Sequence, residues 1–91
     1  MNDFEKELSH RIIDRLHLDE LDAGSIGSDT LLFGEGFGLD SIDALELELM
    51  IKEEYGIIIM QSERNRSTFG SLGILASFIV ENRGRDAGRE V

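Results

Sequence analysis

Apolar residues recur every three or four positions in three stretches of the chain, a spacing typical of α-helices that bury one face. The first stretch predicts a helix over residues 3–17, with apolar residues four positions apart: Phe4, Leu8, Ile12 and Leu16. The second predicts a helix from Ser41 to Tyr55. Asp40 is its expected N-cap and Gly56 its expected C-terminal stop, because each residue type favours that position.

The rest of the chain predicts a last helix and the connections. Thr68 caps the last helix, which runs to about Asn82 with an apolar face formed by Phe69, Leu72, Leu75, Ala76 and Ile79. Residues 18–39 predict a long loop held to the core by Ile26, Leu31, Leu32, Phe33 and Phe37. The isoleucines of residues 56–60 favour extended structure, but a single strand has no partner, so we expect a connection and then a helical turn over residues 61–65. The prediction is all-α: a four-helix bundle of three main helices and a short third helix.

The helix over residues 41–55 is apolar on two sides, at about 100° per residue. One stripe contains Leu47, Ile51 and Tyr55, and the nearly opposite stripe contains Ile42, Leu45 and Leu49, flanked by Glu46 and Glu53. One stripe faces the core. The other either packs against another helix or is an exposed strip bordered by acids, which would suit transient contact with another protein.

Length and composition indicate one small domain. Of the 91 residues, we expect the domain over residues 1–82 and a polar, disordered tail over residues 83–91. The chain has no cysteine, which suits a reducing compartment. Its longest uninterrupted apolar run, residues 57–60, is far shorter than the roughly 20 residues of a membrane span. We therefore expect a cytoplasmic protein.

The negative charge is concentrated in the first half of the chain. Of the net charge of −10, residues 1–54 carry −11 and the remainder +1. Such a surface repels nucleic acid and favours basic protein partners, although it is also what a face kept charged for solubility would look like. His10 and His17 lie two turns apart with no third ligand nearby, so we expect exposed histidines and no metal site.

Ser41 lies where a glycine-bearing loop meets this acidic helix. A hydroxyl there faces unpaired backbone N–H groups and the positive end of the helix dipole, so we expect a phosphate ester on it to be stabilised. The sequence supplies no base that would make Ser41 a hydrolytic nucleophile, and the second glycine of a G-x-S-x-G turn is missing. Ser41 therefore indicates a modification site.

Residues 38–47 read GLDSIDALEL, which resembles the signature of acyl carrier proteins, G-x-D-S-L followed by an acidic helix. Other residues fall where carrier proteins have similar ones, namely Phe33, Phe37, the Tyr-Gly-Ile of residues 55–57, and Thr68. The resemblance covers roughly residues 4–79. The resemblance implies that residues 1–82 form an acyl carrier domain.

The resemblance implies a non-catalytic carrier in which Ser41 is esterified by 4′-phosphopantetheine. A separate phosphopantetheinyl transferase that requires Mg²⁺ would transfer this arm from coenzyme A, and the terminal thiol would carry acyl intermediates as thioesters. Asp40 would help to present Ser41. Enzymes with basic patches that transfer, condense or modify acyl groups would contact Ile42, Asp43, Leu45, Glu46, Leu49 and Glu53. The carrier would be a monomer, without membrane insertion or nucleic acid.

Three positions depart from the usual pattern. Ile42 replaces the commoner Leu, Glu48 stands where an apolar residue is usual at the core edge, and Gly36 stands where an acid is frequent. These departures favour a carrier for a specialised lipid or polyketide pathway over a housekeeping fatty-acid carrier. The alternative is an unmodified acidic interaction module with the same fold, and a hydrolase is a distant third.

Overall fold

The computed structural model describes the backbone of residues 2–89 and the side chains of residues 2–22 and 24–83. Within this part of the chain the structure is helical and contains no strand, which confirms the predicted all-α bundle. The helices are α1 (Asp3–Arg15), α2 (Ser41–Tyr55), α3 (Arg66–Phe69) and α4 (Leu72–Arg89), with 3₁₀ turns η1 (Ala23–Ser25) and η2 (Gln61–Glu63). None of the helices described is long and apolar enough to cross a bilayer.

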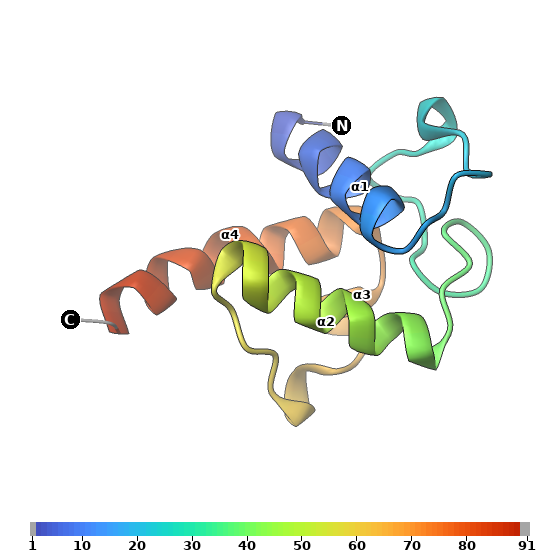
Figure 1. Ribbon diagram of the computed structural model, residues 1–91. Helices are drawn as coiled ribbons and strands as arrows, with labels where there is room; N and C mark the ends of the chain where they lie inside the picture. Colours follow the sequence, from blue (N-terminus) through green and yellow to red (C-terminus); the bar gives the residue numbers. More distant parts are fainter. Residues whose placement is uncertain (1, 90–91) are drawn as a thin grey trace.

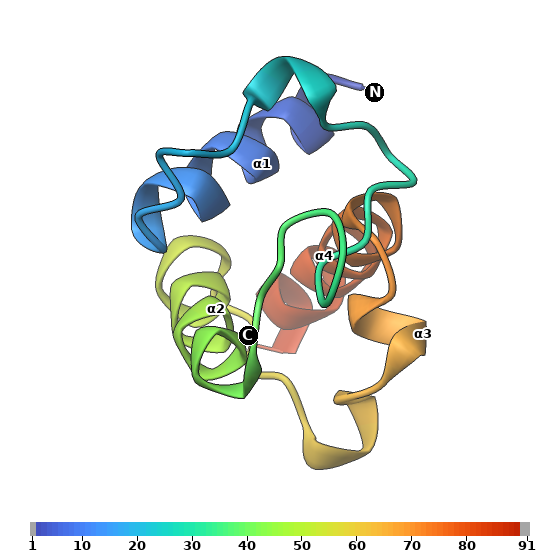
Figure 2. The same cartoon turned by 90° about the vertical axis from the view of Figure 1, so that its right-hand side faces the viewer.

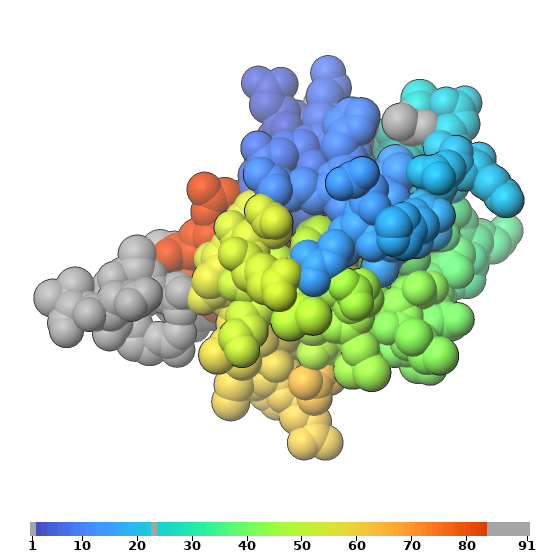
Figure 3. Space-filling model, in the orientation of Figure 1, coloured from blue at the N-terminus to red at the C-terminus, as the bar shows by residue number. Residues whose placement is uncertain are grey.

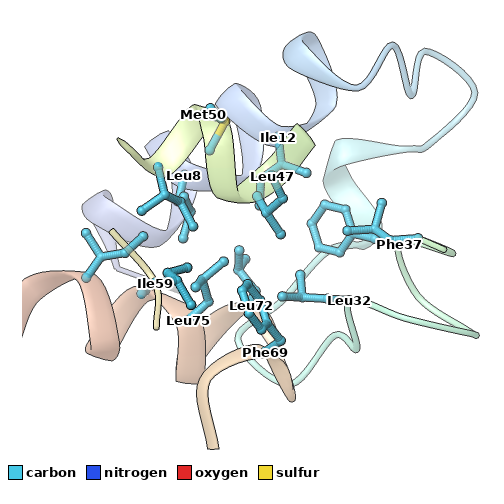
Figure 4. Packing of buried hydrophobic residues seen from close by; sticks show 14 of the residues in the cluster. Leu8, Ile12, Leu32, Phe37, Leu47, Met50, Ile59, Phe69, Leu72 and Leu75 are labelled. Atoms are coloured by element: carbon cyan, nitrogen blue, oxygen red, sulfur yellow. The ribbon is translucent and has the colours of Figure 1, made fainter. Parts of the chain in front are cut away.

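Helices α1, α2 and α4 enclose the core, and the short α3 leads into α4 (Figure 1). The long connection from α1 passes beside α4 before it returns to α2 (Figure 2). Apolar side chains from all three main helices and from this connection meet in the interior (Figure 4). The fully buried ones include Leu8, Ile12, Leu32, Leu47, Ile51, Leu72, Leu75 and Ile79. The helical spacing therefore identified the core faces of α1 and α4 correctly, and of the two apolar stripes of α2 the one with Leu47 and Ile51 faces the core.

Helix α1 ends two residues earlier than predicted. Arg15 is its last residue, and His17 has a left-handed backbone conformation with φ of 56°. The N–H of Leu18 donates to the carbonyl of Ile13 at 2.9 Å, which closes the helix end as a Schellman motif does. Gly usually takes the left-handed position of this motif, and because His17 takes it here, no glycine marks the end of the helix.

The start of the last helix was predicted wrongly. Thr68 is not an N-cap but a buried residue inside α3, whose N-cap is Asn65. Helix α4 begins at Leu72, four residues after Thr68. Carbonyl groups of the long loop accept its first N–H groups. The N–H of Leu72 donates to the carbonyl of Thr30 at 3.0 Å, and that of Gly73 to the carbonyl of Ser28 at 2.9 Å.

The long loop is held to the core largely by the expected side chains. Ile26, Leu32 and Phe37 are buried, and Phe33 is half-buried against Phe69 in an edge-to-face contact with ring centroids 6.2 Å apart. Leu31 is the exception, because its side chain is 48% exposed. Its backbone holds the loop instead: the carbonyl of Leu31 accepts the N–H of Phe37 at 2.9 Å.

Helix α4 extends to Arg89, beyond Asn82 where we expected it to end. The predicted tail, residues 83–91, thus falls partly within this helix, while Glu90 and Val91 lie outside the described residues. The disorder of the tail and the domain boundary at residue 82 stay predictions.

Glu5 is a buried carboxylate that joins α1 to the long loop. Its Oε1 accepts the hydroxyl of Ser28 at 2.7 Å and the N–H of Asn2 at 2.9 Å. These two hydrogen bonds lower the pKa of Glu5 from its usual 4.5, and the bond from Ser28 has the larger effect. Because the folded pKa is the lower one, ionised Glu5 stabilises the fold above the unfolded pKa. This stabilisation is lost as the pH falls through the folded pKa.

We therefore expect Glu5→Gln to flatten the acid limb of the stability curve. The variant should be less stable than the wild type near pH 7, and the difference should shrink as the pH falls to about 3. Urea midpoints across this range measure both effects. Glu20→Gln, at an exposed carboxyl in the loop, is the control and should leave the acid limb unchanged. A constant difference between Glu5→Gln and the wild type at every pH would contradict the linkage.

Candidate functional site

Ser41 is the first residue of α2 and its side chain is exposed. The preceding residue, Asp40, is the N-cap, as predicted. Its Oδ1 accepts the N–H of Ile42 at 3.0 Å and that of Asp43 at 2.9 Å. In return, Asp43 Oδ2 accepts the N–H of Asp40 at 3.1 Å, which completes a capping box. The backbone on both sides of Ser41 is thereby fixed while its hydroxyl stays accessible.

This capping box corrects one expectation about Ser41. The N–H groups of Ile42 and Asp43 are not unpaired, because the Asp40 carboxylate already accepts both. A phosphate ester on Ser41 would therefore lie beside the carboxylates of Asp40 and Asp43 without those two donors. Two carboxylates beside the hydroxyl attract cations more readily than they stabilise an anion.

The loop that precedes Asp40 folds back on itself and fixes the position of Ser41. The N–H of Leu39 donates to the carbonyl of Leu32 at 3.0 Å, and Phe33 and Leu39 form a parallel bridge. The side chains of Leu32, Phe37 and Leu39 are all buried. Ser41 is therefore held between a loop packed into the core and the capped end of a helix.

The second apolar stripe of α2 is exposed, which decides between the two alternatives that the sequence left open. The side chains of Ile42, Leu45 and Leu49 are 75%, 66% and 42% exposed. With Leu16 and His17, which directly follow α1, and with charged residues of both helices they line an open groove of about 690 Å³. Figure 3 shows this face, with α2 in yellow-green beside α1 in blue. A groove that combines three exposed apolar side chains with charged ones, next to an accessible serine, is suited to contact with another protein.

The acidic side chains of α2 are all engaged within the molecule. Asp43 belongs to the capping box, and Glu54 forms an ion pair with Arg11 of α1. Glu46 Oε2 lies 2.6 Å from Arg15 Nε, and Glu53 Oε1 lies 2.8 Å from Arg15 Nη2. The sequence predicted Glu46 and Glu53 as partner-binding acids but did not identify Arg15 as their partner.

Glu48, the acid at the core edge, is also paired. Its carboxylate accepts Arg64 Nε, with Oε2 at 2.8 Å and Oε1 at 3.0 Å, and its side chain is only 14% exposed. This pair links α2 to the segment between η2 and α3. A charged residue is therefore accommodated at the core edge because an arginine neutralises it.

Five of the predicted residues line the groove together, namely Ile42, Asp43, Leu45, Glu46 and Leu49. Asp40 and Ser41 lie at the start of α2, and Glu53 lies toward its C-terminal end. Sequence reasoning missed Arg15 of α1 and Leu16 and His17 directly after it, which also line this groove. In the sequence these residues were recognisable only as the end of an amphipathic helix. That position does not show which other helix packs beside them. No protein-family model matches the sequence, and no solved structure gives a significant match to the fold.

Proposed function

We propose that the chain is an acyl carrier protein that bears 4′-phosphopantetheine on Ser41. The observation that carries the proposal is the exposed hydroxyl of Ser41, on the first residue of a capped helix whose outer stripe is apolar and exposed. The likeness of residues 38–47 to the carrier signature supplies the chemical identity. The arm would come from coenzyme A, and the protein itself would catalyse no step.

In this proposal each part of the site has a distinct role. A transferase would add the phosphodiester at the Ser41 Oγ, and Asp40 would keep the serine at the accessible start of α2. Asp40 and Asp43 would favour the approach of the Mg²⁺ or the basic groups that accompany coenzyme A. The strip of Ile42, Leu45 and Leu49 would contact the enzymes that load, extend or unload the acyl group. The protein would act as a cytoplasmic monomer in fatty-acid, specialised lipid or polyketide synthesis.

The test is modification by a broad-specificity phosphopantetheinyl transferase with coenzyme A and Mg²⁺, read out by intact mass. The wild type should gain one phosphopantetheine, and Ser41→Ala should gain none. Ser67→Ala is the matched control, because Ser67 is another exposed serine near a helix start and its replacement should not prevent modification. A folded wild type that gains no mass would instead indicate the unmodified interaction module.

A further inference from the structure

Arg15 connects the end of α1 to two acids of α2 at once. Its Nε lies 2.6 Å from Glu46 Oε2 and its Nη2 lies 2.8 Å from Glu53 Oε1. Glu46 and Glu53 are seven residues apart, so both carboxylates lie on one face of α2, two turns from each other. A planar guanidinium with donors on several nitrogens can reach both, which a single ammonium group does less well.

Of these two acids, Glu46 lies at the exposed apolar strip, whereas Glu53 lies two turns further along α2. Glu46 lines the same groove as Ile42, Leu45 and Leu49, and Arg15 lines it too. A basic partner that placed an apolar side chain in this groove would bring its own arginine or lysine toward Glu46. That residue would find the carboxylate already paired with Arg15.

We propose that Arg15 is a specificity residue of this surface, because it competes with the basic side chains of a partner for Glu46 and Glu53. This inference deepens the proposed function and rests on it, because it requires that partner enzymes approach α2. Charge complementarity still favours a basic partner, since three acids, Asp14, Asp43 and Glu46, line this groove with Arg15, and Glu53 also pairs with Arg15. Arg15 lowers the contribution of charge pairing to the binding free energy. The contribution of the apolar strip is then the larger part.

The competition is reversible because the pairs are exposed at the surface. The side chains of Glu46 and Glu53 are 42% and 52% exposed, and ion pairs of this kind are weak and screened by salt. A partner can therefore displace Arg15 at a modest cost. Specific partners would be those whose apolar contact compensates for that cost, and proteins that are merely basic would bind weakly.

Arg11 provides a matched comparison within the same helix. It lies one turn before Arg15, carries the same charge and also pairs with an acid of α2, Glu54. Glu54 lies at the end of α2 away from the groove. Arg11→Gln therefore changes the net charge and removes an α1–α2 link as Arg15→Gln does, but leaves Glu46 and Glu53 paired.

The test is an NMR titration with an oligoarginine peptide, followed at the methyl groups of Ile42, Leu45 and Leu49. Arg15→Gln should bind the peptide at these methyls about two- to fivefold more tightly than the wild type, with a steeper salt dependence, as expected for the release of exposed ion pairs. Arg11→Gln should resemble the wild type there. Adding Glu46→Gln and Glu53→Gln to Arg15→Gln should cancel the gain.

Equal affinities of Arg15→Gln and Arg11→Gln at the strip would overturn the proposal, as would a gain that survives loss of both acids or a peptide that does not perturb the strip in any variant. Arg15→Lys keeps the positive charge but lacks the planar guanidinium, so it should give a smaller gain in affinity for the peptide. It replaces Arg15→Gln if that variant does not fold. Neither the peptide nor the readout requires a modified Ser41. The result is therefore independent of whether the transferase modifies the protein.

Discussion

Replacing Ile51 with alanine should destabilise the protein by about 2–5 kcal/mol, because this side chain is fully buried and its loss leaves a cavity. Ile51 lies on the inner stripe of α2, the stripe of Leu47, Ile51 and Tyr55 that faces the core. Leu47 and Met50 of the same helix are also buried. Small domains have only about 5–15 kcal/mol of stability in total, so this single change should remove a large part of it. Urea unfolding, with the midpoint and the slope fitted separately, measures the loss.

Leu45→Ala is the control for this prediction, because Leu45 belongs to the outer stripe of the same helix and is 66% exposed. Its replacement should change the stability by no more than about 0.5 kcal/mol. The same variant should weaken contact with a partner if the outer stripe is a docking surface. Similar losses of stability for Ile51→Ala and Leu45→Ala would show that the outer stripe is packed in solution and not available for binding.

The parts of the fold that depend on local signals were predictable from the sequence. The bounds of α2 were predicted correctly, because its cap, Asp40, and its stop, Gly56, lie next to the residues that they affect. The two apolar stripes were also separated correctly, since helical spacing places residues on faces without any knowledge of the neighbouring helices. The spacing alone did not show which stripe was exposed.

The start of α4 depends on contacts between residues far apart in the chain, and here the prediction was wrong. Its first N–H groups donate to the carbonyls of Ser28 and Thr30, more than 40 residues earlier. Backbone carbonyls have no sequence signature, so Thr68 was the more plausible cap. In the structure Thr68 is buried inside α3, and Asn65 caps that short helix instead.

The candidate site also combines features set by neighbouring residues with features set by contacts between distant parts of the chain. Ser41, Asp40 and Asp43 are close in sequence, and their arrangement follows from the capping of one helix. The pairing of Glu46 with Arg15 joins residues 31 positions apart, and it depends on the way α1 packs beside α2. An acid that appears free in the sequence can thus be engaged in the fold, which changes what it offers to a partner.

Gly36→Ala should destabilise the fold by about 3 kcal/mol or more, through the loop that positions Ser41. Gly36 has φ of 77°, in the left-handed region that disfavours a side chain. A Cβ at this position would also overlap the carbonyl oxygen of Leu31 and lie 3.0 Å from the N of Leu31. That carbonyl accepts the N–H of Phe37, and Leu31 also pairs with Ser71, so it is not free to move aside. The loop must therefore distort, and we expect the amide resonances of Asp40 and Ser41 to shift.

Gly34→Ala separates the two causes, because Gly34 has a similar φ of 70° but nothing within 4 Å of an added Cβ. It should cost only about 1–2 kcal/mol, the backbone contribution alone, and leave the resonances of Asp40 and Ser41 near their wild-type positions. The difference between the two variants in urea midpoint then reports the close approach of Gly36 to Leu31. If both variants lost the same stability, the contact with Leu31 would be too loose to hold the loop. The position of Ser41 would then depend on the helix cap alone.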